Sequence, residues 1–208
     1  MTLFDISRRI SPQTAVWPGD QPHALEHVLR KREGYAVNLT TLHLSPHTAT
    51  HADAPYHFND AGAHPDSLPL GPFIGQAQVV WVERQQGGIT PADLDGQLHA
   101  PVQRVLLRTW VSALPDEQFA ENFPYPTLAL VDWLAEQGAV LLGVDMPSVD
   151  DFHSSDLPCH HRLAARGLAH LENLWLRDVP PGLYELIALP LRLAGACGSP
   201  VRAILRTL

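Results

Sequence analysis

The feature that most restricts the fold of this chain is a short apolar run at residues 139–144, Ala-Val-Leu-Leu-Gly-Val, which ends at Asp145. A run of this length without a polar residue is typical of a strand that is buried on both faces. It follows a segment, residues 127–138, in which apolar side chains recur at helical spacing. Thr127 can cap the start of this helix and Gly138 can end it. A helix that leads into a doubly buried strand predicts an α/β fold.

Other segments predict a β-rich core with flanking helices. Residues 37–44 alternate apolar and polar side chains, which indicates a half-buried strand. The remaining predicted elements are strands at 75–82, 104–108, 185–193 and 201–205, a short helix at 91–94 and a helix at 158–166. We find no internal repeat or linker, and a chain of 208 residues can bury one sizeable core. The sequence therefore predicts a compact single α/β domain over residues 1–208.

The charge and the termini exclude some partners. The chain has 22 acidic and 14 basic residues, and no Lys/Arg cluster is large enough to offset the formal charge of -8. Nucleic acid is therefore not an expected partner. No run of about 18 apolar residues could span a membrane, and the first residues lack the order of a secretory signal. We expect a cytoplasmic protein in which Cys159 and Cys197 are free thiols.

The clearest candidate for a functional site is the segment of residues 47–57, His-Thr-Ala-Thr-His-Ala-Asp-Ala-Pro-Tyr-His. His47, His51, Asp53 and His57 are all of metal-ligand type, and small residues lie between them. Imidazole nitrogens with a carboxylate oxygen suit Zn²⁺ or a similar divalent ion such as Mn²⁺. A polar loop with solvated histidines is the alternative, which explains a single histidine better than four. The candidate metal site begins where the preceding predicted strand ends.

Further ligands can come from downstream. The residues that compete for this role are His153, Cys159, His160, His161, His170 and Glu172. A soft thiolate at Cys159 would be an acceptable zinc ligand. Spacing alone leaves the choice open, and for each of them a surface histidine or a buried cysteine remains the alternative.

Several motifs together resemble the signature of the cyclase-like metal hydrolases and, within that family, the bacterial kynurenine formamidases. The central motif is His47-x-x-x-His51-x-Asp53-Ala54-Pro55-x-His57-Phe58. The match continues through residues 17–20 (Trp-Pro-Gly-Asp), 145–150, 160–173 and 184–191, so it covers nearly the whole chain. The resemblance implies a cyclase-like α/β fold of the swivelling β/β/α type.

The resemblance also implies two divalent metal ions per chain, Zn²⁺ with Mn²⁺ as an alternative. The implied ligands are His47, His51 and Asp53 for one ion and His160 for the second, with Asp53 and Glu172 bridging them. His160 is preferred over His161 because the family's ligand histidine stands seven residues before the glycine that aligns with Gly167.

The implied reaction is hydrolysis of N-formyl-L-kynurenine to L-kynurenine and formate, an arylformamidase step in tryptophan degradation. By the resemblance, His57 is the expected catalytic acid and base, and Trp17 is the expected aromatic contact of the substrate. No Gly-x-Ser-x-Gly elbow is present, which argues against the serine-hydrolase route. Ala49 stands where many relatives carry glycine, and we expect the loop to turn there without a strongly positive φ.

Two alternatives stay open. The first is a sister hydrolase of the same family that acts on a cyclic amide or ester such as isatin. The second is a non-catalytic metal-binding module, in which four protein ligands would close the metal site. The expected partners are a small-molecule substrate and a second copy of the chain in a homodimer.

Overall fold

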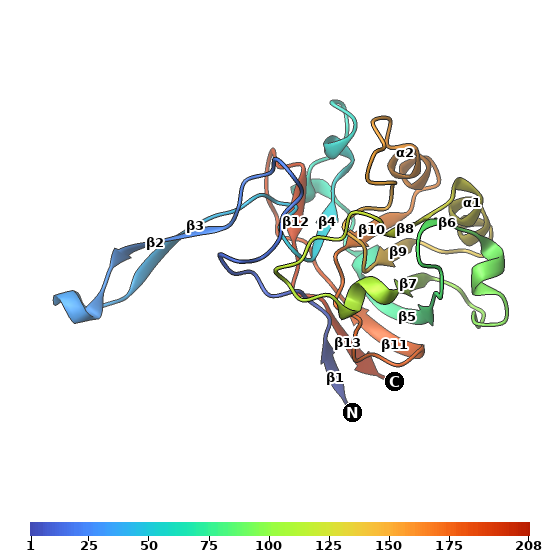
Figure 1. Cartoon of the computed structure of the whole chain (residues 1–208), viewed down its shortest axis with the longest axis horizontal. Coiled ribbons are helices and arrows are strands. Elements are labelled where there is room, and N and C mark those ends of the chain that lie inside the picture. The colour runs from blue at the N-terminus through green and yellow to red at the C-terminus, as the bar shows by residue number, and fades with distance from the viewer.

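A nine-stranded mixed sheet organises the computed structural model, which describes all residues 1–208 (Figure 1). The strand order is β1-β13-β11-β5-β7-β9-β10-β4-β12. The central pairs β5–β7, β7–β9 and β9–β10 are parallel, and the outer pairs are antiparallel. The strands of this sheet are β1 (Leu3–Asp5), β4 (His51–Asp53), β5 (Ile74–Trp81), β7 (Arg104–Arg108), β9 (Leu141–Val144), β10 (Ala169–Glu172), β11 (Gly182–Ile187), β12 (Gly198–Pro200) and β13 (Ile204–Thr207).

Two α-helices and several short elements connect the strands. The helices are α1 (Leu128–Glu136) and α2 (Pro158–Ala165); the 3₁₀ turns are η1 (Lys31–Glu33), η2 (Pro55–His57), η3 (Pro65–Ser67), η4 (Gly71–Phe73), η5 (Pro91–Leu94) and η6 (Trp110–Ala113). Two small pairs, β2 (Ala24–Leu29) with β3 (Leu39–His43) and β6 (Gly87–Ile89) with β8 (Pro124–Pro126), lie outside the main sheet. None of the helices combines the length and the apolar character needed to cross a bilayer.

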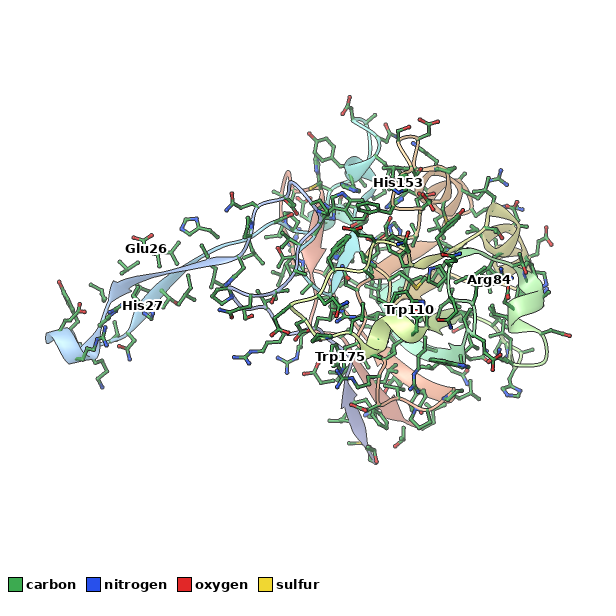
Figure 2. All side chains as sticks on the ribbon, viewed as in Figure 1. Glu26, His27, Arg84, Trp110, His153 and Trp175 are labelled. Atoms are coloured by element: carbon green, nitrogen blue, oxygen red, sulfur yellow. The ribbon has the colours of Figure 1, made fainter.

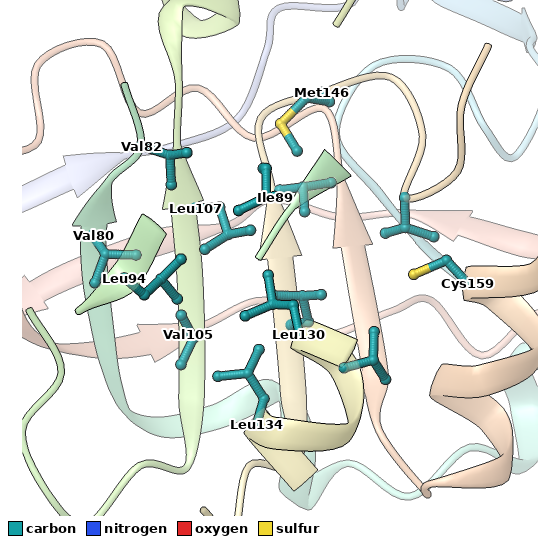
Figure 3. Close-up of a cluster of buried hydrophobic side chains, with 14 of the residues drawn as sticks. Val80, Val82, Ile89, Leu94, Val105, Leu107, Leu130, Leu134, Met146 and Cys159 are labelled. Atoms are coloured by element: carbon teal, nitrogen blue, oxygen red, sulfur yellow. The ribbon is translucent and has the colours of Figure 1, made fainter. Parts of the chain in front are cut away.

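Alternation along the central strands divides the buried side chains between the two faces of the sheet. On β7, Val105 and Leu107 belong to one cluster of buried side chains, whereas Leu106 belongs to the other. The first cluster lies between the sheet and α1, where Leu130 and Leu134 pack onto it (Figure 3). Period-2 alternation explains this division, and burial of both faces explains the continuous apolar runs seen in the sequence.

The structure confirms the α/β class and most predicted elements. Thr127 caps α1 by accepting a hydrogen bond from the backbone N–H of Leu130, and all of β9 is buried. The two closing strands are shorter than expected. The predicted strand at 185–193 is β11, which ends at Ile187, and the one at 201–205 is replaced by β12 and β13 on either side of residues 201–203.

The prediction of a half-buried strand at residues 37–44 was wrong in one respect. A strand forms there, β3, but every residue of it is exposed. It pairs only with β2, which the sequence pattern did not reveal, and the pair projects away from the rest of the chain (Figure 1). Alternation reports that one face of a strand differs from the other, but it does not report whether the molecule covers the apolar face.

Candidate active site

Two antiparallel strands, β4 and β10, form the floor of the candidate site. Their register places His51 opposite Glu172 and Ala52 opposite Leu171. Because side chains alternate along a strand, Ala52 and Leu171 enter the hydrophobic core and their neighbours point to the other face. The buried residues on that second face are His51, Asp53, His170 and Glu172. The sequence prediction treated residues 47–57 as a loop, and the strand within it is what sets this geometry.

Two further histidines reach the same point from outside these strands. His160 lies in the first turn of α2 and is buried. His47 lies in the turn before β4, beside Gly198 of the neighbouring strand β12. A Cβ atom on Gly198 would stand 3.0 Å from Cε1 of His47, so the absence of a side chain there leaves room for the imidazole.

The carboxylate of Asp53 is the centre of the cluster. Its Oδ1 atom lies 2.9 Å from Nδ1 of His47 and 3.2 Å from Nε2 of His51. Its Oδ2 atom lies 3.2 Å from Nε2 of His160 and 3.3 Å from Nε2 of His170. Glu172 has the same two-sided arrangement, with Oε2 at 3.3 Å from His51 and Oε1 at 3.6 Å from His160.

The carboxylates and imidazoles of this cluster shift one another's pKa values. Burial alone would lower the pKa of each imidazole, but the carboxylates outweigh it, and the pKa rises to about 9 for His47 and to about 10 for His51 and His160. Burial would likewise raise the pKa of Asp53, but the surrounding histidines hold it well below its usual value. The carboxylates therefore favour protonation of His47, His51 and His160 around an ionised aspartate.

Hydrogen bonds behind the histidines fix which ring nitrogen faces Asp53. Nδ1 of His51 lies 2.8 Å from the carbonyl oxygen of Ala49, and Nδ1 of His160 lies 2.7 Å from Oδ2 of Asp150. Such partners orient metal-binding imidazoles and leave the opposite nitrogen free to bind. The Asp150 carboxylate also accepts hydrogen bonds from the backbone N–H groups of Cys159 and His160, so it holds the start of α2 in place.

The donor set fits a divalent cation. Nε2 of His51 and Oδ1 of Asp53 are both fully buried, and neither has a hydrogen-bond partner. Buried polar atoms without a partner are rare because they lose the solvation of water. Here the two atoms converge within 3.2 Å of each other. Imidazole and carboxylate donors that converge in this way are the ligand types of zinc and similar ions.

His57 lies beside the cluster but differs from its other members. Its side chain is 34% exposed, and its Nε2 atom is 3.9 Å from Oδ2 of Asp53, beyond hydrogen-bond distance. The ring stands between those of His47 and His160, with centroids 4.1 and 5.8 Å away. Burial lowers the pKa of His57, so this imidazole is neutral at physiological pH while its neighbours are charged.

A cavity of about 470 Å³ opens onto the cluster and is lined by His47, His51, His57, His160 and Glu172. Trp17 also lines the cavity and packs against Phe119 and Phe152, with ring centroids 5.5 and 5.1 Å away. Charged residues line it as well: Arg8, Asp20 and Asp116, with Arg8 3.5 Å from Asp116. The lining of the cavity thus combines metal-ligand, aromatic and charged side chains.

The backbone around the cavity includes residues in the left-handed region, where φ is positive. Only three non-glycine residues have positive φ, namely Ala49 at 59°, Leu157 at 44° and Asn173 at 55°. All three line the cavity. Strained backbone of this kind concentrates at functional sites. The expectation that Ala49 avoids positive φ was wrong: the carbonyl of this residue must turn toward the ring of His51, and the surrounding contacts hold alanine in a conformation that glycine adopts more easily.

The structure brings His47, His51, Asp53, His160 and Glu172 together, as the sequence analysis expected of a ligand set. It places three of the competing residues elsewhere. Cys159 lies in the hydrophobic core and burial raises its thiol pKa; His161 is exposed and its ring packs on Phe58; His153 carries no contact to the cluster and lies at the surface (Figure 2).

Sequence reasoning missed two residues of the site, Asp150 and Cys197, and left a third, His170, unassigned. His170 was only one of several competitors, although His170-x-Glu172 repeats the two-residue spacing of His51-x-Asp53 and could have indicated a second strand facing the first. Asp150 and Cys197 had no signal of their own. Cys197 reaches Nε2 of His47 at 3.1 Å only because β12 pairs with β4.

Comparison with known proteins agrees with this site. The family model Cyclase, described as "Putative cyclase", matches residues 4–151, and the chain belongs to this family. The curated "Kynurenine formamidase" of Salinibacter ruber (strain DSM 13855 / M31) is 46% identical over 208 residues, which cover 99% of this chain and 98% of that protein. The resemblance inferred from the motifs is thereby confirmed.

Solved structures share the fold. One, described as "The Structure Of Potential Metal-Dependent Hydrolase With Cyclase Activity", has a TM-score of 0.85 at 24% identity, with 98% of this chain and 96% of that chain covered. Isatin hydrolase A from Ralstonia solanacearum has a TM-score of 0.83 at 25% identity, with coverage of 98% and 91%. At 24% identity, the likeness to the potential metal-dependent hydrolase shows the fold alone. It confirms the predicted cyclase-like α/β fold.

Proposed function

We propose that this protein is a metal-dependent kynurenine formamidase that hydrolyses N-formyl-L-kynurenine to L-kynurenine and formate in tryptophan degradation. The observation that carries the proposal is the 46% identity, over 99% of the chain, to a curated kynurenine formamidase. The donor set around Asp53 and the cavity that opens onto it support a hydrolytic metal site.

The proposed cofactor is a pair of divalent ions, Zn²⁺ with Mn²⁺ as an alternative. The two-sided contacts of Asp53 and Glu172 support two ions, because each carboxylate turns one oxygen to His51 and the other to His160. We propose His47, His51 and Asp53 as ligands of the first ion and His160 of the second, with Asp53 and Glu172 bridging. His170 joins the second group as a further candidate, since its ligand atom lies with those of Asp53, His160 and Glu172 within 4.8 Å.

When bound, the metal supplies Lewis-acid chemistry, because it lowers the pKa of water and stabilises negative charge on a carbonyl oxygen. The residues of the chain provide the rest. His57 is neutral and partly exposed to the cavity. It can therefore accept a proton from the attacking water and donate it to the aniline nitrogen as the formyl C–N bond breaks. Trp17 can stack on the aryl ring of the substrate.

The charged residues that line the cavity suit the amino-acid part of the proposed substrate. N-formylkynurenine carries an α-ammonium and an α-carboxylate group, and Arg8, Asp20 and Asp116 offer charges of both signs. Isatin has no such groups. The sister-hydrolase reading therefore remains only a second candidate, supported by the structural likeness to isatin hydrolase A.

The non-catalytic module fits the site less well. A structural zinc site is closed by its four protein ligands, whereas here the cavity reaches four of the proposed ligands and His57. We also propose a homodimer and a cytoplasmic location; the two cysteines are not joined in a disulfide, which suits a reducing compartment.

The test is an assay of formate release from N-formylkynurenine by protein of measured zinc content, with isatin ring opening assayed in parallel. The proposal expects kcat/KM to be at least about 100-fold higher for N-formylkynurenine. A preference for isatin would establish the sister hydrolase, and failure of both substrates with fully loaded protein would reject the proposal.

A further inference from the structure

Arg8 is a buried cation in the lining of the cavity. Its side chain is only 8% exposed, and its backbone N–H donates a hydrogen bond to Oγ1 of Thr50, directly before β4. Its Nη1 and Nη2 atoms donate to the carbonyl oxygens of Leu114 and Val111. The guanidinium carbon lies 4.9 Å from the ring centroid of Trp175, which Figure 2 labels. These contacts hold the charge in one place, so a ligand can bind it with little loss of side-chain freedom.

The guanidinium of Arg8 has more donors than acceptors around it. A guanidinium offers five N–H donors, but Nε of Arg8 is buried without a hydrogen-bond partner. The nearest carboxylate, that of Asp116, places its Oδ1 atom 3.5 Å from Nη1, and this oxygen also has no hydrogen-bond partner. Buried polar atoms without a partner are rare. The two side chains attract each other but leave hydrogen-bonding capacity for a ligand.

Asp116 is a better candidate than Asp20 for binding a cationic group, although both line the cavity. Oδ1 of Asp20 already accepts a hydrogen bond from the backbone N–H of Gln21, at 2.7 Å. The side chain of Asp116 is 19% exposed. Its backbone carbonyl accepts a hydrogen bond from the N–H of Ala15, another residue of the lining, which fixes Asp116 relative to the cavity.

A ligand with neighbouring charges of opposite sign fits the pair of Arg8 and Asp116. An α-amino acid carries its ammonium and carboxylate groups on one carbon atom, so its two charges are adjacent, as those of the pair are. Its carboxylate can accept a hydrogen bond from the guanidinium while its ammonium donates one to the aspartate, and both bonds are charge-assisted. The same cavity is lined by Trp17 and by metal-ligand side chains, so one ligand can reach all three kinds of group.

We propose that Arg8 and Asp116 form the subsite for the amino-acid end of the substrate, where Arg8 binds the α-carboxylate and Asp116 binds the α-ammonium group. The subsite selects aryl formamides that carry a free amino acid over those that lack one. This proposal rests on the proposed function, because it takes N-formylkynurenine as the substrate.

The first test compares four substrates of the zinc-loaded wild-type protein. They are N-formylkynurenine, its decarboxylated analogue N-formylkynuramine, its deaminated analogue, and ortho-formamidoacetophenone, which lacks both charged groups. A hydrogen bond to a charged group is worth about 10- to 100-fold in affinity. Removal of either charge should therefore lower kcat/KM by about that factor, mainly through KM. Equal kcat/KM for N-formylkynurenine and ortho-formamidoacetophenone would overturn the proposal.

The second test assigns the two roles by ratios of kcat/KM. Arg8→Gln should reduce the preference for N-formylkynurenine over its decarboxylated analogue by about 10- to 100-fold, and Asp116→Asn should do the same for the deaminated analogue. The matched control is Arg177→Gln, which should keep both preferences. Arg177 also stacks on Trp175, with its guanidinium carbon 4.4 Å from the ring centroid, but it does not line the cavity.

Ratios separate substrate binding from a structural role. A purely structural role of Arg8 would lower kcat/KM for all four substrates together and leave their ratios unchanged, which would overturn its assignment. Because loss of a buried guanidinium can also unfold the chain, the nearly isosteric Asp116→Asn tests the pair independently. Unchanged ratios in Asp116→Asn, or a loss of the ammonium preference in Asp20→Asn instead, would overturn the assignment of Asp116.

Product binding separates this proposal from the formamidase proposal. A wild-type protein that releases formate from all four substrates at equal kcat/KM would reject the subsite and leave the formamidase activity established. A wild-type protein that releases formate from none of them would reject the formamidase. In that case isothermal titration calorimetry still decides about the subsite: L-kynurenine should bind at least about 10-fold more tightly than ortho-aminoacetophenone, and equal binding would overturn the proposal.

Discussion

Gly198→Ala offers a direct test of how closely the chain is packed around His47. Gly198 lies on β12 opposite Asp53 of β4. An added Cβ would stand 3.0 Å from Cε1 of His47 and 3.1 Å from the carbonyl oxygen of Ala52. The carbonyl belongs to a paired strand and cannot move far, so the imidazole must give way by a few tenths of an ångström.

The expected cost follows from that displacement. Ligand distances in a metal site tolerate about 0.2 Å, and changes to the surroundings of a ligand typically lower metal affinity by about 10- to 100-fold. Overpacking of a buried site also costs about 1–3 kcal/mol of folding free energy. We therefore expect Gly198→Ala to bind zinc about 10- to 100-fold more weakly and to unfold at lower temperature.

The assay is competition for zinc with a chelator of known affinity, followed by thermal unfolding of the metal-free protein. Gly71→Ala is the matched control, because no heavy atom lies within 4 Å of a Cβ built there, and it should behave as wild type. Wild-type zinc affinity in Gly198→Ala would refute the reasoning, since it would mean that His47 either moves freely or does not bind the metal.

Four further predictions concern the metal, catalysis, the substrate and pH. Elemental analysis should find two zinc ions per chain, and His160→Ala should reduce this to one; a firm ratio of one that His160→Ala leaves unchanged would reject the binuclear site. His57→Ala should keep its metal but lose about 10²- to 10⁴-fold in kcat, whereas loss of an ion would make His57 a ligand. Trp17→Ala should remove roughly 0.5–1.5 kcal/mol of stacking from N-formylkynurenine and leave a small aliphatic formamide unaffected; equal losses on both would show that Trp17 only holds the loop with Phe119 and Phe152. Finally, the pKa of His47 is about 9 in the folded chain and about 6.5 in the unfolded chain. The pairing of His47 with Asp53 therefore stabilises the metal-free chain fully below pH 6.5, and this stabilisation is lost as the pH rises through 9. Urea unfolding at pH 7 and pH 10 should show this loss, and equal stability at the two values would contradict the pairing.

Much of the fold and the chemical character of the site could be predicted from the amino-acid sequence. Residues 139–144 predicted a buried strand, because their apolar composition leaves no polar face for solvent, and the strand that forms there, β9 (Leu141–Val144), is buried throughout. Thr127 and Gly138 bounded α1 through local capping chemistry that requires no tertiary contact. The spacing of His47, His51 and Asp53 likewise indicated a metal site, since donors so close along the chain can face one ion.

The distant side chains that complete the site could not be predicted, because contacts between remote segments bring them there. His170 enters because β10 pairs with β4 in a register that puts Glu172 opposite His51, and hydrogen-bond register between distant strands has no signature in either strand. Asp150 orients His160, and Cys197 reaches His47, only after α2 and β12 are in place. The hairpin β2–β3 is the opposite case: β3 has the alternation of a half-buried strand, but every residue of it is exposed, because alternation within a strand does not report whether the molecule covers its apolar face.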